Sequence, residues 1–370
     1  MKPRIGSYVI GLDHLRALAA LLVFFWHGIH QRGIPWGHVP NHWISSLFEE
    51  GWVGVTLFIT ITGFVFTVIT HGKGIDFVGF IKNRLLRLLP LIFIVTLFAV
   101  NAQGANQQSL FTFFTLLGGG TVYGTWTLVV EFQFYVSYPF LRNTLIRQKA
   151  AATVLACFAM CLFFVILRLA YFYSNGKPQE IAYWTIFGQA DAFIAGILAG
   201  LAYIHCRANP LPWGRLLYVA SLAIAMTLVL GLGHWFNKTG GFYERPAYPS
   251  TSRIWVFWPT VVAIPWAVVV WSYCLLTSHL TGRIARAIAY LGAISYSTYM
   301  FHFITLPLCS KLFDTYIGIR FAGAEIWNQG IILMLFHYPF TVGVSAISFE
   351  LIEKAFLKQR TPYLTEVDIR

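Results

Sequence analysis

The chain has 370 residues, of which 57% are hydrophobic and only 11% are charged, and its formal net charge is +12. A soluble domain carries about 25% charged residues because water must wet its surface, so this composition excludes a soluble globular protein. Lys and Arg lie in short clusters between apolar runs, which argues against a nucleic-acid-binding face. The five cysteines lie in or beside apolar stretches without metal-ligand spacing, so we expect no disulfide framework and no metal site.

The apolar runs are long enough to cross a membrane, because a transmembrane helix needs about 20 mostly apolar residues. By this measure the sequence predicts an all-α integral membrane protein with ten spans, at residues 12–30, 50–70, 86–102, 124–141, 149–172, 181–205, 214–233, 254–277, 286–308 and 327–350. The apolar segment 108–120 is shorter, and we predict that it is interfacial or re-entrant. We expect residues 1–355 to form one transmembrane domain and residues 356–370 to form a cytoplasmic tail.

The distribution of Lys and Arg predicts the orientation, because cytoplasmic segments carry the excess of positive charge. With a cytoplasmic N-terminus, 17 of the 26 Lys and Arg fall on the cytoplasmic side, 7 on the other side and 2 within spans. An even number of spans then places both termini in the cytoplasm, and the protein in the cytoplasmic (inner or plasma) membrane. The first apolar run begins with Asp13 and Arg16 and lacks a small-residue cleavage site, so we expect no removed signal peptide.

Ionisable side chains inside a bilayer are costly, so each one is a functional candidate. Arg16 and His27 are eleven residues apart in the first span, which places them on one helix face about 16 Å apart in height. The rise per residue also brings Glu131, in the fourth span, and His302, in the ninth span, to the outer level of His27. An imidazole beside a carboxylate could form a general base and the group that orients it.

Structural roles are the alternatives for these residues. His302 could simply form a hydrogen bond with a neighbouring helix, and Glu131 could be the ion-pair partner of Arg168. Asp191 in the sixth span has no evident partner in the sequence, so a helix-packing role is as reasonable as any other.

A basic run precedes the predicted third span. Arg84 and Arg87 are three residues apart and project from one helix face at the membrane edge. Guanidinium groups bind phosphate oxygens in a forked geometry, so the pair could clamp a phosphate group. The alternative is ordinary positive-inside anchoring, and the spacing alone favours this alternative.

Six motifs in chain order resemble the acyltransferase-3 family of membrane O-acyltransferases. They are Leu12–Ala20 with Trp26-His27, Gly51–Phe58 with Gly63-Phe64, Lys82–Pro90, Trp126–Leu128 with Glu131, Phe134-Tyr135 and Pro139, Ile294–Tyr299 with His302, and Glu353-Lys354. His14 stands where the family usually has Gly, and Phe132 stands where a second acidic residue often follows Glu131. The chain carries no appended hydrolase-like domain, so it resembles a stand-alone member.

The resemblance implies transfer of an acetyl or short acyl group from cytoplasmic acetyl-CoA (or another acyl-CoA) to a hydroxyl group. The acyl-CoA is a co-substrate, and no permanently bound cofactor is implied. The expected acceptor is a sugar of a surface glycan, and membrane lipids are the other expected partners. The implied roles are donor binding by Arg16, Arg84, Arg87 and Trp126, base or acyl-carrier chemistry by His27, orientation of that imidazole by Glu131, and oxyanion stabilisation by Tyr299 or His302.

Two other functions remain open from the sequence. The acceptor could be a small molecule such as a macrolide, because the resemblance covers such enzymes and the outer loops carry no readable acceptor motif. Intramembrane His, Glu and Asp residues also form proton relays, so a proton-coupled transporter is the alternative from another class. A transporter would often show inverted repeats and paired broken helices, and neither is evident in the sequence.

Overall fold

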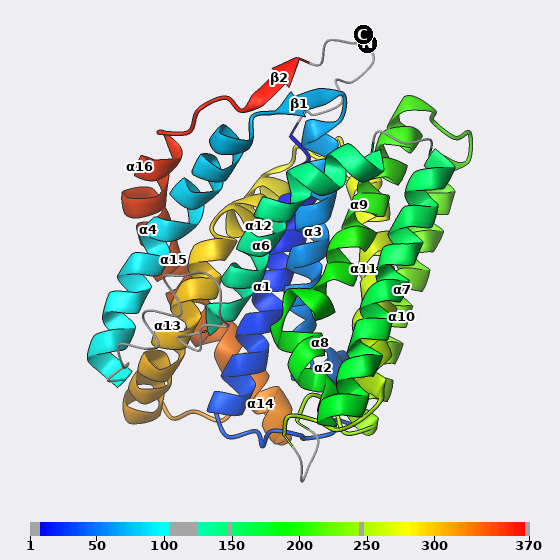
Figure 1. Ribbon diagram of the computed structural model, residues 1–370. Coiled ribbons are helices and arrows are strands. Elements are labelled where there is room, and N and C mark those ends of the chain that lie inside the picture. Colours follow the sequence, from blue (N-terminus) through cyan, green and yellow to red (C-terminus); the bar gives the residue numbers. More distant parts are fainter. Residues whose placement is uncertain (1–7, 104–123, 147–149, 244–247, 367–370) are drawn as a thin grey trace.

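A computed structural model describes residues 8–103, 124–146, 150–243 and 248–366 (Figure 1). The predicted interfacial segment 108–120 lies outside these residues. The long helices are α1 (Ile10–Gln31), α3 (Val53–Thr70), α4 (Phe77–Gln103), α6 (Trp126–Leu141), α7 (Ala150–Asn175), α9 (Ile186–Ala208), α10 (Gly214–Lys238), α11 (Ile254–Leu276) and α13 (Ser295–Tyr316). A last helical stretch runs through α14 (Glu325–Ile332), η3 (Leu333–His337), α15 (Tyr338–Ser348), η4 (Phe349–Glu353) and α16 (Lys354–Leu357).

Shorter elements connect these helices. They are α2 (Trp43–Glu49), η2 (Arg142–Ile146), α8 (Pro178–Trp184) and α12 (Arg283–Ala293), with two three-residue strands, β1 (Lys73–Ile75) and β2 (Leu364–Glu366). Among the described residues, seven helical stretches are long and apolar enough to span a membrane. The all-α, multi-pass membrane architecture predicted from the sequence is therefore confirmed, whereas the count of ten spans remains a prediction.

The predicted ninth span, 286–308, is two helices rather than one. Helix α12 ends at Ala293 and α13 begins at Ser295. Gly292 packs so closely on α1 that a Cβ atom there would lie 1.8 Å from the backbone oxygen of Asp13. Helix α12 also exposes Arg283 and Arg286, and charged side chains are disfavoured in the hydrocarbon core. Those two arginines and the tight contact account for a separate short helix at the end of the bundle.

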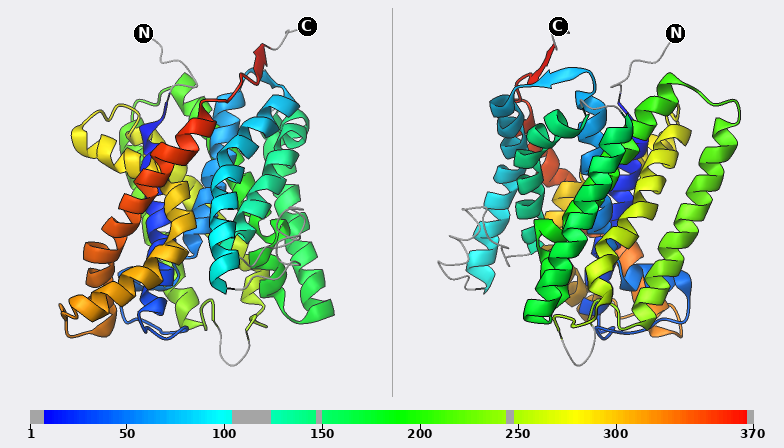
Figure 2. Two further views of the ribbon diagram at one scale, coloured as in Figure 1. Left: turned by 90° about the vertical axis from the view of Figure 1, so that its left-hand side faces the viewer. Right: turned by 45° about the vertical axis from the view of Figure 1, so that its right-hand side comes forward.

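Helices α1 and α3 form the centre of the bundle (Figures 1 and 2). Helix α3 crosses α9 at two glycines, where a Cβ atom on Gly63 would lie 2.2 Å from the oxygen of Phe193 and one on Gly196 would lie 2.1 Å from the oxygen of Thr60. Such close approach through small residues is typical of helix pairs in membranes. It brings the backbones of α3 and α9 into direct contact.

Two groups of helices flank this centre. Helices α7, α9, α10 and α11 lie on one side, and α4, α13 and α15 lie on the other (Figure 1). Helix α7 exposes many large apolar side chains, including Leu155, Phe158, Leu162 and Phe163. A helix face of this kind suits contact with lipid chains, because apolar side chains need not be buried in protein where the hydrocarbon core of the bilayer surrounds them.

The two strands lie at the end of the bundle where α1 begins (Figure 1). Strand β2 pairs antiparallel with β1, with Lys73 opposite Glu366 and Ile75 opposite Leu364. The start of α1 and the strand near the C-terminus are therefore at the same end, which we call the strand end. The positive-inside rule predicts that this end is cytoplasmic.

Candidate functional site

A pocket lined by three arginines lies among α1, α3, α4, α6 and α13. Its lining residues surround about 800 Å³ of non-protein space, a figure that includes the open mouth of the pocket. Its polar lining consists of Arg16, Thr62, Arg84, Arg87, Thr127, Glu131, Tyr135, Ser295, Tyr296 and Tyr299. We call it the arginine pocket. The three guanidinium groups predicted to bind the donor are thus brought together from two helices.

The three arginines differ in the partners of their guanidinium groups. Arg16 forms an ion pair of 2.8 Å with Asp13. Arg84 lies over the rings of Phe66, Phe80, Tyr135 and Tyr363, at 4.8 to 5.8 Å from their centres, and its Nη2 donates to the Tyr363 hydroxyl at 3.1 Å. Among the described residues, Arg87 forms no ion pair within 4.0 Å, so its charge is available to an anion.

Glu131 faces the arginine pocket. Its Oε1 accepts a hydrogen bond of 2.5 Å from the Tyr135 hydroxyl and a longer one of 3.4 Å from Thr62. Thr127, Glu131 and Tyr135 follow one another at intervals of four residues on α6, so they share the helix face that lines the pocket. Three guanidinium groups outnumber the carboxylates of Glu131 and of Asp13, the partner of Arg16, so the pocket is positively charged.

A second pocket, the histidine pocket, is lined by Val23, Trp26 and His27 of α1 and is therefore further from the strand end than the arginine pocket, which Arg16 of the same helix lines. The lining of the histidine pocket is mostly aromatic and surrounds about 670 Å³ of non-protein space, open mouth included. Its lining is Val23, Trp26, His27, Val55, Gly124, Trp126, Tyr183, Trp184, Tyr243, Tyr299 and Phe303. Trp126, predicted to bind the donor, is thus in this pocket and not among the arginines.

The two pockets share Val55 and Tyr299, and we call this boundary the neck. The Tyr299 hydroxyl donates to the backbone oxygen of Gly124 at 3.0 Å and accepts from the Thr127 hydroxyl at 2.9 Å. Gly124 has φ +68°, and a Cβ atom there would lie 2.9 Å from the Phe303 ring, so glycine is needed at this position. These two bonds hold the Tyr299 side chain at the boundary between the positive pocket and the aromatic one.

His27 and His302 are in direct contact. Nε2 of His302 lies 3.1 Å from Nδ1 of His27, which also lies 2.9 Å from the backbone oxygen of Val23. Nδ1 of His302 lies 2.5 Å from the oxygen of Tyr299. Glu131 faces the other pocket and does not take part in this contact, although the depth calculation placed it beside His27.

The alternative pairing of Glu131 with Arg168 is wrong. Arg168 is fully buried and forms an ion pair of 2.7 Å with Asp191, which also accepts a hydrogen bond of 2.5 Å from Thr260. Further bonds from Arg168 reach the backbone oxygens of Val256 and Phe187. Asp191, which had no evident partner in the sequence, is therefore part of a buried network that joins α7, α9 and α11.

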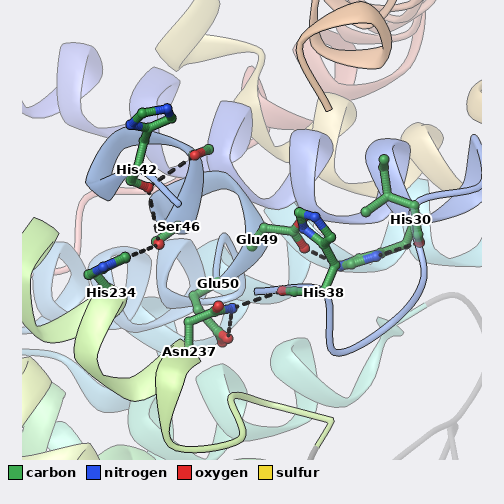
Figure 3. Close-up of polar contacts among 10 residues, drawn as sticks. His30, His38, His42, Ser46, Glu49, Glu50, His234 and Asn237 are labelled. Carbon is green, nitrogen blue, oxygen red and sulfur yellow. Dashed lines mark hydrogen bonds and ion pairs between the residues drawn. The ribbon is translucent and has the colours of Figure 1, made fainter. Parts of the chain in front are cut away.

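A polar cluster lies beside the histidine pocket, around α2 (Figure 3). Glu49 is buried and lies 2.8 Å from Nδ1 of His38 and 3.3 Å from Nε2 of His30. Its neighbour Glu50 accepts hydrogen bonds from Trp52 at 2.6 Å and Asn237 at 2.9 Å. Burial, and then the adjacent Glu50, raise the pKa of Glu49 to about 8, and burial raises the pKa of Glu50 to about 7.

This cluster supports the wall of the histidine pocket. Trp36 stacks on His30 with 3.8 Å between ring centres, and it also contacts Trp26 and Tyr243. Trp26 and Tyr243 line the pocket. The sequence analysis did not identify this cluster, although the adjacent acidic pair Glu49-Glu50 at the start of an apolar run is a usable signal.

Comparison with known proteins agrees with this arrangement. A family model described as an acyltransferase domain, acyltransferase-3, matches residues 9–350. A protein of Bacillus subtilis named "Putative peptidoglycan O-acetyltransferase YrhL" is 24% identical over 82% of this chain and 50% of its own length. The O-acetyltransferase OatA of Staphylococcus aureus is 24% identical over 80% of this chain and 50% of its own length.

The chain spans about half the length of the curated relatives it matches. No solved structure matches it. The family match covers the residues that line both pockets, from Arg16 to Phe303. The chain therefore belongs to the acyltransferase-3 family.

Proposed function

We propose that the protein transfers an acetyl or other short acyl group from a cytoplasmic acyl-CoA to a hydroxyl group on the opposite side of the cytoplasmic membrane. The observation that carries this proposal is the meeting of a positively charged pocket and a histidine-bearing aromatic pocket at Val55 and Tyr299. A donor with phosphates at one end and a thioester at the other needs both environments, joined in this order.

The donor would enter from the strand end. Its diphosphate would bind Arg84 and Arg87, because guanidinium groups form charge-assisted hydrogen bonds with phosphate oxygens, and Arg16 would add charge behind them. The narrow pantetheine arm would then pass the neck and carry the thioester to His27. This route assigns a role to each of the arginines that line the pocket.

His27 is suited to act as the general base. A carbonyl oxygen can only accept a hydrogen bond, so in neutral imidazoles Nδ1 of His27 carries the proton that faces Val23, and Nδ1 of His302 carries the proton that faces Tyr299. The single proton on Nδ1 of His27 is then shared between the oxygen of Val23 and Nε2 of His302, both of which accept. This tautomer leaves a lone pair on Nε2 of His27, the nitrogen a base needs.

The proposed reaction is a direct transfer. Nε2 of His27 takes the proton of the acceptor hydroxyl as its oxygen attacks the thioester carbonyl carbon. The C–S bond then breaks, the CoA sulfur leaves as thiolate, and the imidazolium returns the proton to it. His302 assists by fixing the His27 tautomer, the role that the resemblance implies for Glu131.

The acceptor would be a sugar of a surface glycan. Trp26, Trp126, Trp184 and Tyr243 line the histidine pocket, and flat aromatic faces suit the apolar faces of sugar rings. The names of the relatives point the same way, since one of them is described as acting on peptidoglycan.

The test is titration of the detergent-purified protein with acetyl-CoA, followed by a transfer assay with a glycan fragment. We expect saturable binding to the wild type and to His27→Ala, with transfer by the wild type alone. Arg87→Gln should weaken binding, whereas Arg283→Gln, an exposed arginine on α12, should not. Absence of acetyl-CoA binding to the wild type would refute the proposal, and transfer only to a small hydrophobic alcohol would replace the glycan acceptor.

A further inference from the structure

The segment Arg360–Glu366, which we call the strap, is fastened to the start of α4. Backbone N and O of Thr361 bond to the side chain of Asn83, at 3.0 and 2.6 Å. The backbone oxygen of Tyr363 accepts from the backbone N of Asp76 at 2.8 Å, and Leu364–Glu366 pairs with β1. These bonds fix the strap against the residues that precede Arg84.

The strap also contacts the arginine pocket itself. The hydroxyl of Tyr363 accepts a hydrogen bond of 3.1 Å from Nη2 of Arg84, and the Tyr363 ring lies 5.8 Å from the guanidinium carbon. The same ring packs against Phe80, whose ring centre is 5.4 Å away. Arg84 lines the pocket, so the strap determines the orientation of one of its three guanidinium groups.

Arg360 is the first residue of the strap and does not itself line the arginine pocket. Its neighbour Thr361 is held by Asn83, one residue before Arg84, and its own side chain is exposed. Partial burial, and then the positive charges of Arg87 and Arg84, lower the pKa of Arg360 to about 10. Like charges repel one another, and an anion with several phosphate groups would relieve the repulsion.

We propose that the strap is part of the donor site, with Tyr363 positioning Arg84 for the diphosphate of the acyl-CoA and Arg360 binding its outermost 3′-phosphate. Arg84 is buried and Arg360 is exposed, and this order of depth matches the order of the phosphates in the donor as it enters. The strap lies beyond residues 9–350, which the family model matches. The inference rests on the proposed use of acyl-CoA.

The test compares acetyl-CoA with acetyl-3′-dephospho-CoA as ligands of the purified full chain. Arg360→Gln should weaken acetyl-CoA binding about five- to tenfold, as expected for one exposed charge-assisted contact, and should leave binding of the dephospho ligand unchanged. Tyr363→Phe keeps the ring but removes the acceptor for Arg84. It should weaken both ligands about equally, by about threefold, because the diphosphate is common to them.

Arg283→Gln is the matched control, because it removes one exposed arginine from α12 without touching the strap. A general electrostatic effect would lower acetyl-CoA affinity equally in Arg283→Gln and Arg360→Gln and would overturn the inference. So would an equal loss for both ligands in Arg360→Gln. If the wild type bound neither ligand, the proposed function itself would fail. If the wild type bound acetyl-CoA and the strap variants bound it equally well, the proposed function would stand and the inference would be overturned.

Discussion

Nε2 of His302 lies 3.1 Å from Nδ1 of His27, so two imidazoles from α13 and α1 form a hydrogen-bonded pair at the boundary of the histidine pocket. His302→Ala should lower kcat about tenfold, because Val23 still accepts from Nδ1 of His27 but the second acceptor is lost. His302→Gln should restore part of the rate, since its amide oxygen can accept the same proton. The measurement is kcat at saturating donor and acceptor.

A matched control lies one turn further along the same helix. Thr305 bonds to Thr341 at 2.7 Å and lines neither pocket, so Thr305→Val should leave kcat within about twofold of wild type. An equal loss of rate in Thr305→Val and His302→Ala would show that α13 packing, rather than the imidazole, controls the rate.

The neck should select donors by the width of their acyl group. Linear acyl chains are no thicker than the unbranched part of the pantetheine arm next to the thioester, whereas branched acyl groups are wider than that part where they pass between Val55 and Tyr299. Val55→Ala should therefore raise kcat/KM for isobutyryl-CoA about tenfold relative to acetyl-CoA. An unchanged ratio, with both donors bound, would mean that selection occurs in the histidine pocket itself.

The raised pKa of Glu49, about 8, predicts a stability that falls with rising pH. An unfolded glutamate ionises near pH 4.3, so between that pH and about 8 the folded state holds more protons and the free energy of unfolding decreases. Thermal unfolding in detergent should show Tm falling between pH 5 and 8.5. Glu49→Gln should flatten this slope by about half.

The groups that face Glu49 are His30, His38 and Glu50, so His38→Gln serves as the comparison for histidine titration. A slope that Glu49→Gln leaves intact and His38→Gln removes would assign the pH dependence to the imidazole instead.

The Arg168–Asp191 pair should matter for stability and not for the reaction. Asp191→Ala leaves a buried guanidinium without its carboxylate and should cost about 3–5 kcal/mol of unfolding free energy. The double change Arg168→Met with Asp191→Leu removes both charges and should recover most of that loss. Acetyl-CoA affinity per folded molecule should be the same in all three proteins; a loss of affinity at equal folded fraction would contradict the structural role.

The sequence placed His27 and His302 at one depth, where they are in contact, but it also placed Glu131 at that depth and expected it to orient His27. Helical rise gives depth correctly only if the helix starts at the membrane edge. Helix α6 instead begins at Trp126, next to Gly124 and Thr127, which form hydrogen bonds with the neck residue Tyr299. Glu131 is one turn beyond Thr127 and therefore lies on the arginine side of the neck. There its carboxylate accepts a hydrogen bond from the hydroxyl of Tyr135, four residues further along α6.

Contacts between distant segments were beyond sequence reasoning. Arg84 and Arg87 were recognised from local spacing, whereas Tyr363 reaches Arg84 across 279 positions through a short polar segment with no apolar periodicity. The same holds for His14, which departs from the family motif. Its imidazole bonds to Tyr273 at 2.9 Å and to the backbone oxygen of Ala285 at 2.8 Å, and only the folded chain brings these groups together.

The most direct test of the account is sidedness of transfer in liposomes that contain the protein in one orientation. The arginine pocket lies towards the strand end and the histidine pocket lies on the far side of the neck, so acetyl-CoA and acceptor should be needed on opposite sides of the bilayer. We predict acetyl transfer when acetyl-CoA is supplied at the strand end and acceptor at the other, and none with His27→Ala. Equally fast transfer with both substrates confined to one side of an intact bilayer would contradict the account.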